Sequence, residues 1–293
     1  MGNYKCELVP DRIQAIKEVR PKSKLGHYPV KRRLDKVILA YNKYTQFGLY
    51  VSTARTMSDQ RKLEGVSSAY TDGSYAASNP DWHVGDSPWK ARQILKAINR
   101  LAKRPNTVAE IGCGAGGILT ELSSLMRADF FGFDPSSYAI SLGRSTDTVV
   151  LRQGGAEDME NYDLVLCIDV IEHVEDVFSF LRSLLPKGKS FIFHIPLDMN
   201  CYCIMRNVVM INRQAMGHIH YFDCNTAIAT LTDCGYSVKD WFYTSNTDLH
   251  RSPAKDVVKS VIFKINPRLA ALTLAGFSII VTAAPADLRG GAS

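Results

Sequence analysis

Short apolar runs alternate with helical patterns over most of the chain beyond residue 87. Strands that alternate with helices favour a parallel sheet with right-handed crossovers. The pattern therefore predicts an α/β fold with a doubly wound, mostly parallel seven-stranded sheet. The expected strands cover 107–111, 129–134, 148–152, 163–168, 190–195, 236–244 and 277–284, with helices at about 117–127, 136–144, 174–185 and 224–234.

Other segments predict how this sheet is bordered. Ser87 is expected to cap a helix that has Pro88 in its first turn and runs to Leu101. Insertions are expected after the fifth strand (197–217) and after the sixth (253–275). We expect a basic N-terminal extension at 1–64, with a helix at Val30–Tyr50, and a catalytic domain at 65–293. Residues 65–86 are rich in turn residues, and together with Trp89 they contain an aromatic cluster that includes Tyr70, Tyr75 and Trp82. This segment is interpreted either as a lid that folds over the cleft or as an ordinary aromatic core under a loop.

Charge is distributed unevenly along the chain. Residues 1–62 carry 14 Lys and Arg against 5 Asp and Glu, whereas the net charge of the whole chain is +6. A basic segment permits contact with nucleic acid or an anionic surface. We favour a solvated arm, because the segment has no repeat and no arginine-rich block. The apolar content of 46% and charged content of 22% exclude wholesale disorder.

The cysteines and the termini indicate a cytoplasmic protein. Seven cysteines, an odd number, stand mostly in apolar runs, which favours reduced, buried thiols over a disulfide framework. The N-terminus does not have the pattern of a signal peptide, and the longest apolar run, Leu269–Pro285, is too short to span a membrane. We therefore expect no transmembrane segment. No sequence feature indicates the oligomeric state.

A glycine-rich turn joins the first expected strand to the next helix. Glycines let the backbone turn sharply and approach a ligand, and the helix N-terminus attracts an anion. Gly112, Gly114 and Gly117 satisfy a dinucleotide pattern, while Gly112, Gly114 and Gly116 satisfy GxGxG equally well. Glu110 separates the two readings, because its carboxylate would repel a pyrophosphate but attract the ammonium or sulfonium of S-adenosylmethionine.

Five segments resemble motifs of class I S-adenosylmethionine-dependent methyltransferases, in particular the type-11/type-23 and quinone-biosynthesis group. They are EIGCGAG (110–116), FFGFDPS with Asp134, YDLVLCIDVIEHVEDV (162–177), LLPKGKSFIFHIP (184–196) and GHIHYFDCNTAIATLTDCGYSV (217–238). The resemblance covers roughly 80–285 and implies a Rossmann-like methyltransferase fold. It also implies a set of residues that bind the cofactor: Glu110, Gly112, Cys113, Gly114, Gly116, Asp134, Ala156, Glu157, Ile168 and Asp169.

The chain departs from this resemblance at one position. The family commonly has Gly-Asp-Ala-Glu after the third strand, and its Asp binds the adenine amino group. Here the run is Gly154-Gly155-Ala156-Glu157, so Gly155 stands where the Asp would be. We therefore expect weaker cofactor binding.

Histidines are the candidate catalytic groups, because the pKa of histidine lies near the working pH. We rank His220 first, then His218, which alternate in an extended segment, and His194, which ends the fifth strand. Glu172 and His173 are interpreted as structural support. Although His218 and His220 resemble a pair of metal ligands, only Asp223 could accompany them, so we expect no metal site.

The leading functional hypothesis is methylation of a small-molecule acceptor, with oxygen as the candidate atom. Methylation of RNA or protein, with the basic arm as the docking surface, is an alternative that the sequence does not favour. A methyltransferase-like scaffold without activity is another, which the retained motif residues argue against. An oxidoreductase is the most distant alternative.

Overall fold

The computed structural model describes residues 84–245 and 253–286. The predicted basic extension at 1–64, its helix at Val30–Tyr50 and residues 65–83 of the predicted lid lie outside this part. The last three lid residues form a short 3-10 helix, η2 (Val84–Asp86).

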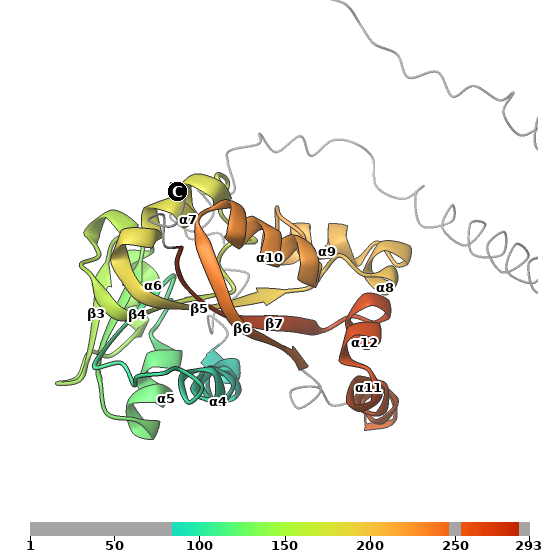
Figure 1. Cartoon of the computed structure of the whole chain (residues 1–293), viewed down its shortest axis with the longest axis horizontal. Helices are drawn as coiled ribbons and strands as arrows, with labels where there is room; N and C mark the ends of the chain where they lie inside the picture. The colour runs from blue at the N-terminus through green and yellow to red at the C-terminus, as the bar shows by residue number, and fades with distance from the viewer. Residues whose placement is uncertain (1–83, 246–252, 287–293) are drawn as a thin grey trace, which may run out of the picture. The chain divides into compact units, whose positions relative to one another are not determined.

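Seven strands form one sheet in the order β3-β2-β1-β4-β5-β7-β6. The first five strands pair in parallel, whereas β7 is antiparallel to both β5 and β6. This arrangement confirms the predicted mostly parallel, doubly wound fold (Figure 1). The strands are β1 (Thr107–Ile111), β2 (Asp129–Asp134), β3 (Val149–Gln153), β4 (Tyr162–Ile168), β5 (Gly188–Pro196), β6 (Tyr236–Ser245) and β7 (Phe277–Pro285).

The helices follow the predicted pattern, and the two insertions are also helical. The insertion after β5 contains α8 (Cys201–Met205) and α9 (Val208–Met216), and the insertion after β6 contains α11 (Pro253–Ile265) and α12 (Pro267–Thr273). The remaining helices are α4 (Ser87–Ile98), α5 (Gly117–Leu125), α6 (Ser137–Leu142), α7 (Val177–Leu184) and α10 (Cys224–Asp233), with short 3-10 turns η3 (Ala156–Asp158) and η4 (Leu185–Lys187).

The prediction for α4 was wrong at both ends. The helix begins at Ser87 itself, and the capping position is Asp86, whose side chain makes no capping hydrogen bond. Pro88 lies in the first turn as predicted, because proline there loses no helical hydrogen bond. The helix ends at Ile98 rather than at Leu101, and Asn99 is its C-terminal cap.

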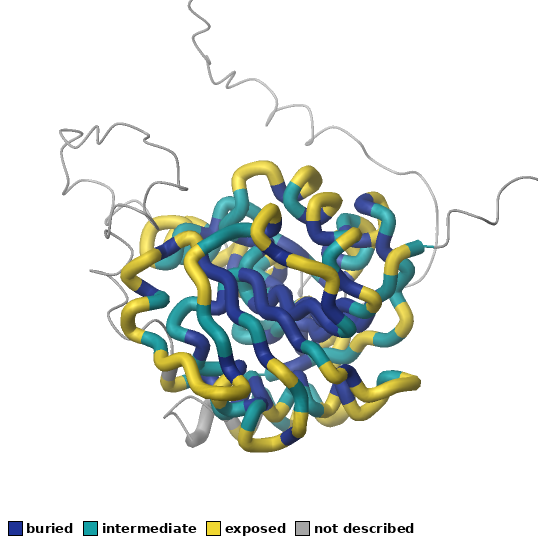
Figure 2. Tube along the Cα trace, turned by 90° about the vertical axis from the view of Figure 1, so that its left-hand side faces the viewer, coloured by how far each residue is buried: buried dark blue, intermediate teal, exposed yellow. Residues whose placement is uncertain are grey.

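Helices cover both faces of the sheet, which divides the core in two (Figures 1 and 2). On one face, α4 and α5 pack through Ile94, Ile98 and Leu122 against strand residues such as Leu164. On the other face, α7 and α10 pack against the opposite side of the same strands. Residues buried on both faces make β4 almost continuously apolar, as is typical of a central parallel strand.

The carboxyl ends of four parallel strands lie side by side. Ile111 pairs with both Phe133 and Cys167, and Ile168 pairs with His194. Ligands of open α/β sheets bind outside these ends, near the point where the strand order reverses. Here that point lies between β1 and β4.

Within the described ranges no helix has the length and apolar character needed to cross a membrane.

Candidate active site

The glycine turn between β1 and α5 has a backbone that only glycine adopts easily. Gly112, Gly114 and Gly116 have φ values of 70°, 55° and 74°. A Cβ on Gly112 would lie 2.6 Å from a methyl group of Val170, and one on Gly116 would lie 2.7 Å from a methyl group of Leu151. The turn is therefore held close to β3 and to the segment after β4 by positions that admit no side chain.

Asp134 fastens this turn to the end of β2. One carboxylate oxygen accepts a hydrogen bond from the Gly114 N–H at 2.9 Å, and the other accepts one from the Ser136 N–H at 2.8 Å. Burial raises the pKa of Asp134, and the two backbone donors oppose that rise. Cys113, between the glycines, is buried, and its N–H donates to the Phe133 carbonyl.

The carboxyl of Glu110 is buried and only partly satisfied. Its side chain is 2% exposed, and Oε2 has no hydrogen-bond partner among the described residues. Burial raises the pKa of Glu110 to about 8; Lys90 opposes this rise, whereas Asp134 and Asp169 add to it. A buried carboxyl without a partner is costly, so this position is suited to a cationic ligand.

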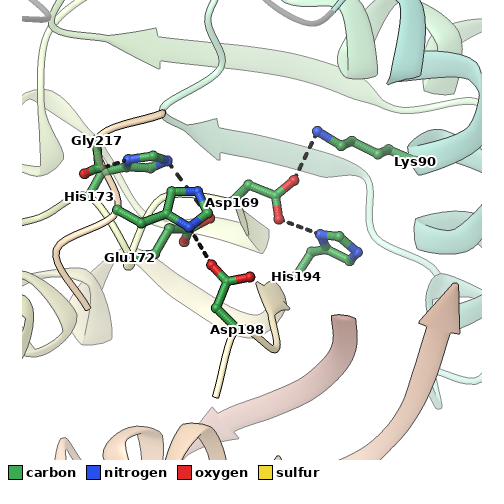
Figure 3. Close-up of polar contacts among 8 residues, drawn as sticks. Lys90, Asp169, Glu172, His173, His194, Asp198 and Gly217 are labelled. Atoms are coloured by element: carbon green, nitrogen blue, oxygen red, sulfur yellow. Dashed lines mark hydrogen bonds and ion pairs between the residues drawn. The ribbon is translucent and has the colours of Figure 1, made fainter. Parts of the chain in front are cut away.

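Asp169, the first residue after β4, is the centre of a polar chain across the site (Figure 3). Its carboxylate lies 2.9 Å from the Lys90 ammonium of α4 and 2.6 Å from Nδ1 of His194. The other ring nitrogen of His194 lies 3.2 Å from the Thr244 hydroxyl of β6. Burial acts to raise the pKa of Asp169, but His194 and Lys90 outweigh it and hold the pKa well below its usual value.

The backbone of Asp169 is strained, with φ of 54°. A non-glycine residue in the left-handed region is uncommon, and such strain gathers at functional sites. Its N–H donates to the His194 carbonyl at 3.0 Å, which continues the pairing of β4 and β5. Ile168 and Asp169 therefore stand at the strand end as the resemblance implies.

The predicted adenine-side residues lie beyond β3. Ala156 is buried at the start of η3, whereas Glu157 is exposed. Gly155 has an extended backbone with φ of −116°, which any residue can adopt, and its N–H donates to the Asp158 carboxylate at 2.9 Å. The missing Asp of the family is therefore not excluded by the backbone.

The two histidines of segment 217–220 bind different partners. Nδ1 of His218, which is buried, lies 2.6 Å from the Asp198 carboxylate, whereas Nε2 of His220 donates to the Val174 carbonyl at 2.9 Å. The segment is fixed by two hydrogen bonds from the N–H groups of Ile219 and His220 to the Glu172 carbonyl. His218 therefore lies beside Glu172 and His173, while the His220 ring is tied to the loop after β4.

The structure adds three residues to those that the sequence indicated. Lys90, Asp198 and Thr244 were not singled out, although Asp198 follows β5 and the strand-end rule could have indicated it. Glu172 and His173 were read as support for the loop. Lys90 gave no usable signal, because a lysine on a helix is ordinarily solvated.

Comparison with known proteins places the chain in a family. A family model described as a methyltransferase domain matches residues 88–238, about half of the chain. The ubiquinone biosynthesis O-methyltransferase of Pseudomonas savastanoi pv. phaseolicola is 34% identical over 130 residues, which are 40% of this chain and 54% of that protein. The protein of the same name from Azorhizobium caulinodans is 42% identical over 84 residues, 26% of this chain and 33% of its own length.

The chain spans between a third and about half of the length of these curated relatives. Among solved structures, the complex between the Haloferax volcanii Trm112 methyltransferase activator and a methyltransferase contains a similar chain. The likeness covers 73% of this chain and 97% of that one, with a TM-score of 0.55 and 13% identity, which shows the fold alone. The chain therefore belongs to the methyltransferase domain family, as its resemblance to class I S-adenosylmethionine-dependent methyltransferases predicted.

Proposed function

We propose that this protein transfers a methyl group from S-adenosylmethionine to an oxygen atom of a small-molecule acceptor. The observation that carries the proposal is the Glu110 carboxyl, buried beside the glycine turn with Oε2 unpartnered. A cationic ligand there would satisfy a group that the protein alone leaves unsatisfied. Family membership supplies the identity of that ligand.

The residues at the strand ends suit the parts of this cofactor. Glu110 offers a carboxylate to its ammonium group, and the turn of Gly112 and Gly114 offers space without side chains. Asp134, already oriented by two backbone donors, retains lone pairs for ribose hydroxyls. The full set proposed to hold the cofactor is Glu110, Gly112, Cys113, Gly114, Gly116, Asp134, Ala156, Glu157, Ile168 and Asp169.

The bound cofactor supplies an electrophilic methyl group on a sulfonium. The chain's part is to align the acceptor and exclude water, which accounts for much of the acceleration of such a displacement. Lys90 and His194 hold the Asp169 carboxylate in place at the end of β4. The Asp169 carboxylate thus keeps a fixed negative charge at this edge of the site.

The names of the relatives support oxygen as the methylated atom and a small molecule as the acceptor. Several proteins with 30–42% identity over the matched segments are ubiquinone biosynthesis O-methyltransferases. A hydroxyl acceptor must lose its proton near the transition state, so a group that promotes this loss is needed. No specific observation in the described residues favours an RNA or protein acceptor.

We assign the acceptor side of the site to His218, His220 and His194, with His218 first. The geometry changes the order expected from the sequence, because Nε2 of His220 is bound to Val174 and both nitrogens of His194 have partners. In the part of the chain that the structure describes, only Nδ1 of His218 has a hydrogen-bond partner, Asp198 at 2.6 Å. The Asp198 carboxylate fixes the orientation and the tautomer of the His218 ring.

The test is cofactor binding followed by methyl transfer with one set of proteins. Calorimetry of the wild-type chain should give a 1:1 complex with S-adenosylmethionine, and Glu110→Gln should weaken it. Incubation with hydroxylated aromatic acceptors should then give an O-methylated product with the wild type. A wild-type chain that does not bind the cofactor would overturn the proposal.

A further inference from the structure

Three side chains outside the proposed cofactor set converge at the same edge of the sheet. One ligand atom from each of Glu172, His173 and His218 lies within 4.8 Å of the other two. Glu172 and His218 are buried, and His173 is partly buried. Glu172 and His173 come from the loop after β4, and the backbone hydrogen bonds to the Glu172 carbonyl bring segment 217–220 against them (Figure 3).

Glu172 is not satisfied by its protein neighbours. Its side chain is 1% exposed, and Oε2 has no hydrogen-bond partner. Its Oε1 lies 3.8 Å from Nε2 of His173, which is too long for a hydrogen bond. A buried carboxyl that merely supported a loop would be expected to find its partners within the protein. The described residues therefore leave one oxygen of this buried carboxyl unsatisfied beside two imidazoles.

Each histidine has its other ring nitrogen bound to an oxygen. Nδ1 of His218 lies 2.6 Å from the Asp198 carboxylate, and Nδ1 of His173 lies 3.3 Å from the Gly217 carbonyl. Histidines that bind metals almost always have their second nitrogen hydrogen-bonded to a carboxylate or a backbone carbonyl, which fixes the ring and its tautomer. The rings of His173 and His218 are nearly perpendicular, with centroids 4.8 Å apart, so they approach Glu172 from different directions.

We propose that Glu172, His173 and His218 bind a divalent transition-metal ion. Two imidazoles and one carboxylate suit Zn²⁺ and its neighbours in the first row rather than Mg²⁺ or Ca²⁺, which prefer oxygen ligands. Bond lengths of about 2.0–2.2 Å to such an ion place ligand atoms closer together than 4.8 Å. The three side chains therefore close on the ion by small rotations.

From the sequence we expected no metal site. The pair His218 and His220 with Asp223 had been judged insufficient for a metal, and in the structure that pair is indeed divided. Asp223 is engaged in capping α10. The ligands instead come from two segments that only the tertiary fold brings together.

Three protein ligands leave coordination positions open, as in catalytic zinc sites. Resting on the proposed function, we infer that an acceptor oxygen takes an open position. An ion holding a hydroxyl lowers the pKa of that hydroxyl, so the proton passes to solvent and the oxygen becomes a better nucleophile. His218 then serves the acceptor as a metal ligand and not as a proton acceptor.

The experiment measures metal binding directly, on the full chain stripped with a chelator. Titration with Co²⁺, followed by visible absorption and by displacement with Zn²⁺, should give one ion per chain. Glu172→Gln should abolish this site, and Asp198→Asn should weaken it by about 10–100-fold, the usual cost of losing a carboxylate behind a metal-binding histidine. A thermal melt of each variant checks that it is folded.

Two control variants exclude adventitious binding. His220→Gln is the matched control for a neighbouring histidine outside the trio, and Cys201→Ser removes an exposed thiol. Both should keep the wild-type Co²⁺ spectrum and stoichiometry. A wild-type chain that binds no ion, or a folded Glu172→Gln variant that binds it as tightly as the wild type, would overturn the proposal.

Cofactor calorimetry on the same samples separates this inference from the proposed function. Metal binding that is lost in Glu172→Gln, together with no methyl transfer by the wild type, would support the site and refute the proposed function. Methyl transfer by a wild-type chain that contains no metal ion and binds none would support the proposed function and refute the metal site.

Discussion

The Lys90 ammonium lies 2.9 Å from the Asp169 carboxylate and so joins the helix before β1 to the residue after β4. The pair is mostly shielded, with 17% and 25% of the two side chains exposed. Asp169 holds a positive φ, and its second oxygen binds His194. Lys90 thus helps to stabilise a strained position in the centre of the site.

Replacing this lysine should destabilise the fold. Breaking a buried ion pair leaves a charge uncompensated, and partial exposure together with His194 reduces the cost, so Lys90→Met should lower the free energy of unfolding by about 2 kcal/mol. Chemical denaturation measures this. Lys96→Met on the exposed side of the same helix is the matched control, with an expected change below about 0.5 kcal/mol. Equal effects of the two substitutions would refute a structural role for the ion pair.

Glu110→Gln should weaken cofactor binding by about 10–100-fold, because a charge-assisted hydrogen bond is worth about 1.5–3 kcal/mol. The affinity of the wild type should rise with pH up to about 8, since a cationic ligand favours the ionised carboxyl and its binding releases the proton. Calorimetry across this range checks both effects. Glu121→Gln, at a partly exposed position on α5, should leave affinity unchanged. An unchanged affinity in Glu110→Gln would exclude the proposed contact.

The same substitution should stabilise the protein without ligand. The pKa of Glu110 is about 8 in the folded state, against roughly 4.3 for an unperturbed Glu. Between these values the folded state binds the proton and the unfolded state does not, so stability falls as pH rises from about 4.3 to 8. Glu110→Gln should lack this loss and be more stable at pH 8 by about 1–2 kcal/mol. A variant that is less stable than the wild type at pH 8 would contradict the assigned burial of an unsatisfied carboxyl.

Restoring the family residue after β3 should tighten cofactor binding. Gly155→Asp is compatible with φ of −116°, and its Cβ would meet only the end of the exposed Glu157 side chain, at 2.6 Å. One added hydrogen bond worth about 0.5–1.5 kcal/mol predicts about a 2–10-fold gain in affinity. Gly155→Ala controls for the change in backbone freedom. Equal affinities of the Asp and Ala variants would place the adenine elsewhere.

The sequence predicted the central strands β1, β4 and β5 well because each is a compact apolar run that the sheet buries on both faces. The strand order and the reversal of β7 come from packing between distant elements, which periodicity does not report. Helices α8 and α9 were missed because 197–217 lacks clear residues that start and stop a helix. Helix α9 follows Asn207, which has a left-handed conformation and makes no capping hydrogen bond with its side chain.

The positions of the residues proposed to hold the cofactor could be predicted because they follow strand ends within short motifs. Glu110 and Gly112 stand out in the local sequence, and Asp134 follows from the resemblance to the family. The polar chain of Lys90, Asp169 and His194 joins three elements, and the cluster of Glu172, His173 and His218 joins two loops. Such groups have no spacing signature, so their chemistry becomes visible only once the chain is folded.

Isotope-labelled S-adenosylmethionine measures the proposed methyl transfer to a small-molecule oxygen. The wild-type chain and Glu110→Gln are incubated with the labelled cofactor and a cell extract that contains small molecules, RNA and protein. We predict that the wild type places the label on the oxygen of a small molecule and that Glu110→Gln does so far more slowly. Label in RNA or protein alone, or no transfer by a wild type that binds the cofactor, would contradict the account.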